Sequence, residues 1–293
     1  MASIQDIRIR DPFVLPLPER RIYCLYGTSV TSRDLSTLPV FYVRASPDLA
    51  EWSDPAAIFS AHPDFWGTRD FWAPEVHFHE GRYWLFASFK AENKCRGTHI
   101  LVAGKPEGPF RPVGPEPATP PEWECLDGTF WREPDGSPWI VFCHEWLQCA
   151  NGEIRAQRLK RDLSGAAGDP VLLFRAGDAP GVSPLGQKVG SQPAYVTDGP
   201  FLWRTATGAL NMIWASFGDG GYREMVAVSE GGVTGPWRLL PDPLFEKDGG
   251  HGMLFRDFGG QLQMCLHQPN HANERMVIVP MDDSGDVLRV ARG

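Results

Sequence analysis

The chain repeats one pattern five times, and this repeat limits the available folds more than any other feature. Each copy starts with a polar or ionisable residue and continues as an apolar strand, a turn and a second apolar strand. The copies read RDPFVLPLPERRIYCLYGTS from Arg10, APEVHFHEGRYWLFASF from Ala73, CLDGTFWREPDGSPWIVFCHEW from Cys125, VTDGPFLWRTATGALNMIWASF from Val196 and GGHGMLFRDFGGQLQMCLHQP from Gly249. The residues at their heads are 52 to 71 positions apart, about the spacing of four-stranded propeller blades.

A second recurring segment lies between these hairpins. In each copy an alternating β-branched strand runs into a turn-rich stretch and a last short strand. These segments begin at Val40, His99, Ile154, Arg223 and Arg275. Two hairpins make a four-stranded unit, and five such units use the whole chain. The sequence therefore predicts an all-β, five-bladed β-propeller with one domain over residues 1–293.

Composition agrees with a single all-β body. The 31 glycines and 27 prolines are spread through the turns rather than pooled in one linker, and no stretch keeps the i, i+3, i+4, i+7 apolar spacing of a helix. Radial repetition of four-stranded sheets also protects the strand edges. No domain boundary is expected.

The heads of the five repeats are predicted to meet. The first strand of a propeller blade lines the central channel, so residues at its head converge on one mouth of that channel. One interpretation is that the acids are turn-forming residues with local hydrogen bonds. Five polar heads in phase favour the other interpretation, a functional site formed by Asp11, Glu75, Asp127, Asp198 and His251.

These motifs resemble glycoside hydrolase family 43. RDPF, WAPEV, LDGTFW, TDGPFL and GGHGM follow the order of the family's blade signatures over essentially the whole chain. The resemblance implies an inverting exo- or endo-acting hydrolase of arabinose- or xylose-containing glycans. It also implies that Asp11 is the general base, that Asp127 orients the site and tunes the acid, and that the acid is the acidic residue of the fourth motif.

The chemistry of inversion fits this division of roles. One carboxylate deprotonates a water and a protonated carboxyl donates to the leaving oxygen, with about 6.5–9.5 Å between them. Different blades across a channel can provide that gap. A third carboxylate near the acid raises the pKa of the acid, because two neighbouring negative charges resist ionising together. Asp127 suits this third role.

The fourth motif departs from the family, which usually has Glu before Gly-Pro where this chain has Asp198. The shorter side chain leaves a second candidate acid, Glu145 in FCHEW, at the end of a strand that returns to the face where Asp127 begins. The other interpretation of Glu145 is a rim carboxylate paired with an arginine. Glu224 in GYREM is a further candidate of the same kind.

Five residues are candidates for substrate binding: Glu75, Trp72, Trp131, Arg204 and His251. Trp72 and Trp131 could stack on a sugar face, although most large rings should pack between blades. Arg204 could bind sugar hydroxyls or form a surface ion pair.

His251 has three interpretations. It is a hydrogen-bonded channel histidine, a sugar ligand, or, as the resemblance implies, a residue that holds a cation or an ordered water beneath the substrate. A calcium-type ion in the central channel is therefore retained as an option, with no cofactor required. No cluster of Cys and His shows the spacing of a zinc site.

Charge and sequence ends restrict the partners. A formal net charge of −8 without a basic run argues against nucleic acid and anionic membranes, and leaves an oligosaccharide as the expected partner, with the oligomeric state open. The start MASIQDIRIRDPF shows no signal peptide, and no run reaches 18 apolar residues. The six cysteines lack paired spacing, which favours free thiols. A cytoplasmic location is expected.

Several functions remain open at this stage. A retaining fructan-type hydrolase on the same fold is suggested by RDP and by EC at Glu124, but the order of these motifs is wrong for it. A β-galactofuranosidase and a non-catalytic carbohydrate-binding propeller that has lost its acid are further alternatives. Because Asp11 and Asp127 persist, an enzyme is favoured, and an exo-acting α-L-arabinofuranosidase is preferred over a β-xylosidase.

Overall fold

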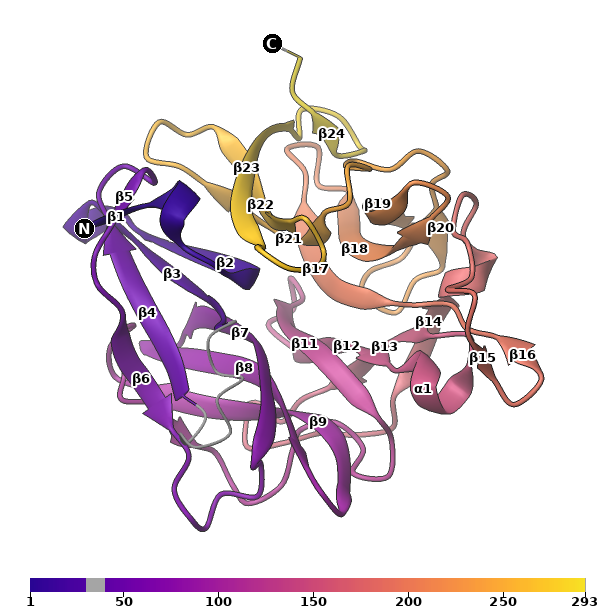
Figure 1. Cartoon of the computed structure of the whole chain (residues 1–293), viewed down its shortest axis with the longest axis horizontal. Helices are drawn as coiled ribbons and strands as arrows, with labels where there is room; N and C mark the ends of the chain where they lie inside the picture. Colours follow the sequence, from indigo (N-terminus) through magenta and orange to yellow (C-terminus); the bar gives the residue numbers. More distant parts are fainter. Residues whose placement is uncertain (30–39, 293) are drawn as a thin grey trace.

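The computed structural model describes residues 1–29 and 40–292 and confirms the five-bladed β-propeller (Figure 1). In each blade four strands pair antiparallel, from the innermost strand outwards. Blades 1 and 2 are β2 (Arg10–Leu17), β3 (Ile22–Thr28), β4 (Val40–Ser46) and β6 (Ala56–Ser60), then β7 (Arg69–His79), β8 (Arg82–Ala91), β9 (Lys94–Ala103) and β10 (Arg111–Pro112). Blade 3 is β11 (Cys125–Arg132), β12 (Pro138–His144), β13 (Glu153–Arg158) and β14 (Val171–Arg175). Blades 4 and 5 are β17 (Asp198–Arg204), β18 (Leu210–Gly218), β19 (Gly221–Ser229) and β20 (Trp237–Leu239), then β21 (Gly250–Arg256), β22 (Leu262–Gln268), β23 (Arg275–Asp282) and β24 (Arg289–Val290).

Short elements connect the blades. Two small ladders pair β1 (Ala2–Ser3) with β5 (Glu51–Trp52) and β15 (Lys188–Val189) with β16 (Gln192–Pro193). The helical turns are η1 (Ile4–Asp6), η2 (Pro18–Arg20), η3 (Ala176–Asp178) and α1 (Trp146–Cys149). None of the helices in the described ranges has the length and apolarity needed to cross a membrane.

The second strand of each blade is apolar because blades pack against it on both sides, which removes the usual alternation of a half-exposed strand. In β18, for example, the seven residues from Leu210 to Ser216 are all buried. Large rings fill the space between neighbouring blades, as predicted. Between blades 1 and 2, Phe41 and Phe71 both contact Phe89, with ring centroids 5.7 and 4.7 Å from it.

The inner strand of every blade contains a β-bulge. In blades 1, 3, 4 and 5 the pairing with the neighbouring strand shifts register once, near the start of the inner strand. In blade 2 it shifts twice, between Arg69 and Trp72 and between Trp72 and Glu75. One residue of each bulge has a left-handed backbone, with φ between 44° and 56°: Asp11, Ala73, Asp127, Gly199 and His251. A bulge re-aims the side chains around it, so these five positions are the structural equivalents around the channel.

This equivalence corrects the phase predicted from the sequence. Asp198 comes one residue before the bulge residue Gly199 and pairs with Ala215, as Arg10 pairs with Thr28 in blade 1. Glu75 comes two residues after Ala73. Matching polar residues alone therefore misplaced the heads of blades 2 and 4, because polarity does not mark which residue occupies the bulge.

A closed circle of hydrogen bonds joins the five bulges. Each left-handed residue donates its backbone N–H to a side chain of the preceding blade: Asp11 to His267 Nδ1 (3.2 Å), Ala73 to Thr28 Oγ1 (2.8 Å), Asp127 to Ser88 Oγ (2.9 Å), Gly199 to Asp127 Oδ2 (3.2 Å) and His251 to the Glu224 carboxyl. The bond from Asp11 to His267 links blade 1 to blade 5, which lie side by side where the ring closes (Figure 1). We call these five contacts the inter-blade ring. It fixes the backbone on which the site residues stand.

Candidate active site

Asp11 is a buried carboxylate with a hydroxyl and two histidine rings around it. The Thr28 hydroxyl donates to Asp11 Oδ2 at 2.6 Å, and His251 Nδ1 and His267 Nδ1 lie 3.2 and 3.5 Å from Asp11 Oδ1. Burial alone would raise the pKa of Asp11. Electrostatic interactions with His251, Arg10 and His267 and the Thr28 hydrogen bond outweigh it and lower that pKa to about 2. Asp11 is therefore ionised at neutral pH and can accept a proton.

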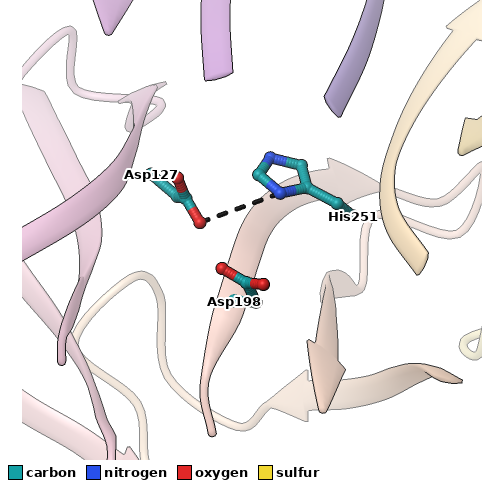
Figure 2. A group of neighbouring side chains, drawn as sticks. All are labelled: Asp127, Asp198 and His251. Carbon is teal, nitrogen blue, oxygen red and sulfur yellow. Dashed lines mark ion pairs between the residues drawn. The ribbon is translucent and has the colours of Figure 1, made fainter. Parts of the chain in front are cut away.

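Asp127 and Asp198 form a carboxyl pair beside Asp11. Their side chains are hydrogen-bonded to each other and point toward His251 from two different blades (Figure 2). Burial raises the pKa of Asp127 to about 6, with a further increase from the charge of Asp11. Burial and the charge of Asp127 raise the pKa of Asp198 well above its usual range. These shifts favour one shared proton on the pair, and the strong upward shift of the Asp198 pKa makes Asp198 the carboxyl favoured to carry that proton.

Two further groups hold this pair in place. The Tyr222 hydroxyl donates to Asp198 Oδ2 at 2.7 Å, and the Gly199 N–H donates to Asp127 Oδ2 at 3.2 Å. A side chain at Gly199 would put its Cβ 2.7 Å from the ring of His251. The glycine of the TDGP motif thus lets the carboxyl pair and the histidine ring approach each other.

His251 connects the base to the carboxyl pair. Its Nδ1 lies 3.2 Å from Asp11 Oδ1. The same nitrogen lies 3.7 Å from Asp127 Oδ2 (Figure 2). It is one of three sequence candidates, with Asp127 and Asp198, whose polar atoms lie within 4.8 Å of one another. These distances agree with a channel histidine held by its neighbours, and its roles toward a sugar or an ion stay predictions.

Glu145 lies outside this cluster. Its carboxylate is paired with Arg96 Nη1, while Arg96 Nη2 binds Asp70 Oδ2 at 3.0 Å. The Arg96 guanidinium also covers the ring of Trp72, 4.2 Å from its centroid. Burial raises the pKa of Glu145, and the Arg96 charge opposes that shift. The arginine-paired interpretation of Glu145 therefore holds in the structure, next to the predicted sugar-stacking residue Trp72.

Three other candidates are not brought to the cluster. Glu75 is buried and binds His77 Nε2 at 2.9 Å. Arg204 ends β17, six residues from Asp198 and so about 20 Å along the strand. There it binds Glu133 at 2.9 Å and lies over Trp131, with 5.6 Å to the ring centroid. Trp131 and Arg204 therefore lie towards the end of their inner strands that is away from the carboxyl cluster, and the ion-pair interpretation describes the contact of Arg204.

Several residues of the site were missed from the sequence: Thr28, Arg96, Tyr222 and His267. All four lie on second or third strands rather than at the heads of inner strands. A pattern restricted to the heads cannot find them. The usable signal is a polar residue at or near the end of a largely apolar second strand, which Thr28 and His267 both show.

The comparison with protein families agrees with this geometry. The sequence model described as glycosyl hydrolases family 43 matches residues 3–284. The chain belongs to glycosyl hydrolase family 43. The predicted resemblance is thereby confirmed, and the blade motifs can be discussed as those of a family 43 propeller.

Relatives of this family 43 chain act on different sugars. An endo-arabinase from Bacteroides thetaiotaomicron is 42% identical over 96% of both chains, with a TM-score of 0.88. The xylosidase/arabinosidase 43A of Humicola insolens is 24% identical over 47% of this chain and 42% of its own length. The β-D-galactofuranosidase xynD of Aspergillus niger is 33% identical over 43% of this chain and 41% of its own length. The chain thus spans about two fifths of the length of these two curated relatives.

Within residues 1–29 and 40–292, one group of donors could hold the predicted calcium-type ion. Asp127, Asp198 and His251 each offer one atom, all within 4.8 Å of one another. Calcium prefers about six to eight oxygen ligands, whereas this group offers oxygens from two carboxyls and one imidazole nitrogen. These donors alone do not fit such an ion. No step below uses one.

The Asp127→Asn variant is expected to shift the pH profile. The charge of Asp127 raises the pKa of Asp198, so removing that charge lowers the pKa at which Asp198 loses its proton. The alkaline limb of kcat/KM should therefore move to lower pH. Asp283→Asn, at a buried carboxylate bound to Arg256 far from the cluster, serves as the control and should leave this limb in place. An unmoved limb in Asp127→Asn would contradict the coupling.

Proposed function

We propose that this family 43 protein hydrolyses α-L-arabinofuranosyl linkages of plant-type glycans with inversion of the anomeric centre. The observation that carries the proposal is a buried cluster in which His251 Nδ1 lies 3.2 Å from Asp11 and 3.7 Å from Asp127, with Asp198 beside them. The surroundings lower the pKa of Asp11 and raise that of Asp198, as a base and an acid require. The 42% identity to an endo-arabinase over nearly the whole chain supports the sugar. The predicted exo action, as an α-L-arabinofuranosidase, is kept as part of the proposal.

The mechanism assigns one proton transfer to each side of the sugar. Asp11 takes a proton from a water whose oxygen bonds to the anomeric carbon, while the bond from that carbon to the leaving oxygen breaks. Asp198 gives its proton to the leaving oxygen. Asp127 keeps Asp198 protonated before this step, because its charge resists a second ionisation nearby. Both carboxyls then return to their first states by exchange with water.

The substrate is tested with linear arabinan and with nitrophenyl arabinofuranoside, xyloside, galactofuranoside and fructoside-type substrates. Release from the arabinose substrates is expected. Exclusive release from the xyloside or the galactofuranoside would identify xylose or galactofuranose as the sugar in place of arabinofuranose. The partial match to a galactofuranosidase makes galactofuranose the second candidate. Exo action releases single arabinose units from chain ends, whereas endo action shortens the chains first. Absence of release from every substrate would favour a binding protein.

The first product is expected to have the inverted anomeric configuration. Asp11 and Asp198 act from blades 1 and 4, and an inverting enzyme uses two separate carboxyls with room for a water between them. Proton NMR of the initial hydrolysate measures the anomer before it equilibrates. A retained anomer would instead favour the fructan-type mechanism.

A further inference from the structure

Blade 4 is the blade that completes the inter-blade ring through its third strand, whereas blade 3 uses the first-strand residue Asp127. In blades 1, 2 and 5, second-strand side chains accept the N–H of the next bulge residue: Thr28, Ser88 and His267. The equivalent residue in blade 4 is Ala215, opposite Asp198, which has no acceptor in its side chain. The acceptor comes instead from the third strand, where Glu224 pairs with Ala215.

Glu224 receives two backbone donors at the head of β21. Its Oε2 accepts the Gly252 N–H at 3.0 Å, and its carboxyl also accepts the N–H of His251. Blade 2 divides the same task between two side chains, since Ser88 binds the N–H of Asp127 and Thr98 binds that of Gly128 at 3.1 Å. Ser88 pairs with Thr98 just as Ala215 pairs with Glu224. One glutamate thus replaces two hydroxyls.

The surroundings make Glu224 a rigid support. Its side chain is fully buried, and Oε1 has no hydrogen-bond partner among the described residues. Its backbone is held on the other side as well, because the N–H of Glu224 donates to the Phe245 carbonyl at 2.8 Å. A Cβ at Gly252 would lie 3.1 Å from the Glu224 carboxyl carbon. The carboxyl therefore packs directly against the backbone that carries His251.

We propose that Glu224 is a positioning residue of the reaction, which sets the backbone of His251 and so holds its ring between Asp11 and Asp127. The inference rests on the proposed function only for its effect on catalysis. His251 has a left-handed backbone, with φ of 56°, and that conformation needs support from its surroundings in a non-glycine residue. Without the Glu224 carboxyl, the His251 ring beside Asp11 loses its fixed position.

The test compares Glu224→Leu with Glu224→Gln. Leu fills a similar volume without an acceptor, whereas Gln keeps one carbonyl oxygen for the two N–H groups. Burial raises the pKa of Glu224 to about 8, so the neutral amide also resembles the carboxyl at neutral pH. On arabinan, kcat of Glu224→Leu is expected to fall about 100-fold, the scale of a misplaced catalytic group. KM should change much less, and Glu224→Gln should stay close to the wild type.

Amide hydrogen exchange at His251 and Gly252 provides a readout that needs no substrate. Exchange should speed up in Glu224→Leu and stay slow in Glu224→Gln. If the wild type cleaves none of the glycans, the proposed function fails while this measurement still decides the backbone contact. Unchanged exchange in Glu224→Leu would overturn that contact.

A matched control separates positioning from general stability. Asp283 is a buried carboxylate near the opposite end of β21, where it binds Arg256 at 2.6 Å and Trp203 at 3.0 Å. Asp283→Asn is expected to lower the melting temperature and leave kcat unchanged. Wild-type kcat in folded Glu224→Leu, or an equal loss in Glu224→Gln, would overturn the proposal.

Discussion

Asp198→Asn is expected to lower kcat on arabinan by about 10²- to 10⁴-fold, the usual contribution of a positioned general acid. The natural leaving group is an alkoxide that needs a proton in the transition state. A nitrophenyl arabinofuranoside should lose much less activity, because nitrophenolate departs largely without help. The ratio between the two substrates, measured with the same enzyme preparation, identifies the acid. An equal loss on both substrates would remove Asp198 from that role.

Glu145→Gln is the control for this experiment. Glu145 is paired with Arg96, which covers the ring of Trp72. Weakening this contact should lower activity on both substrates alike, as expected for a residue that holds the predicted sugar-stacking residue Trp72 in place and donates no proton. If instead Glu145→Gln spares only the nitrophenyl substrate, Glu145 is the acid and Asp198 positions the sugar.

The propeller could be predicted because its signal is repeated. A single segment such as WAPEV carries little information, but five hairpins at similar spacing average out local ambiguity. The apolar second strands contribute most, since strands buried on both faces leave long apolar runs that remain visible in any one blade. The fold could be predicted without knowing the exact register of the strand pairs.

The site depended on the register and was predicted less completely. The bulge places Asp11, Asp127 and His251 at equivalent positions, and polarity at the heads of the strands was enough to find them. In blade 4 the equivalent residue is Gly199, so Asp198 reaches the cluster from the position before it. A bulge is a backbone feature that several residue types allow, so its exact place could not be read from side-chain polarity.

Partners from neighbouring blades were beyond the sequence patterns. Arg96 reaches Glu145 from blade 2, and His267 reaches Asp11 across the closure of the ring. These residues are 49 and 256 positions apart from their partners. Only packing between blades determines such pairs, and a repeat with few polar residues on its second strands gives no direct signal for them.

Asp11→Asn is expected to reduce kcat by about 10²- to 10⁴-fold, as for the loss of a positioned base. The loss should be similar on arabinan and on the nitrophenyl arabinofuranoside, because attack by water is needed whichever group leaves. This equal loss distinguishes the base from the acid, whose loss depends on the leaving group. Near-normal activity of Asp11→Asn would exclude Asp11 from the mechanism.

The fold should survive this substitution, but the acid stability of the protein should change. Asn can still accept the Thr28 hydrogen bond. The pKa of Asp11 is lowered to about 2 in the folded protein, so its charge adds stability above the ordinary aspartate pKa of about 3.9, and that stability is lost as the pH falls toward 2. Asp11→Asn lacks this contribution. Its melting temperature should therefore lie below that of the wild type at neutral pH, and the difference should shrink at pH 2 to 3. A constant difference across that range would mean that the charge of Asp11 is not stabilised by His251, Arg10 and His267.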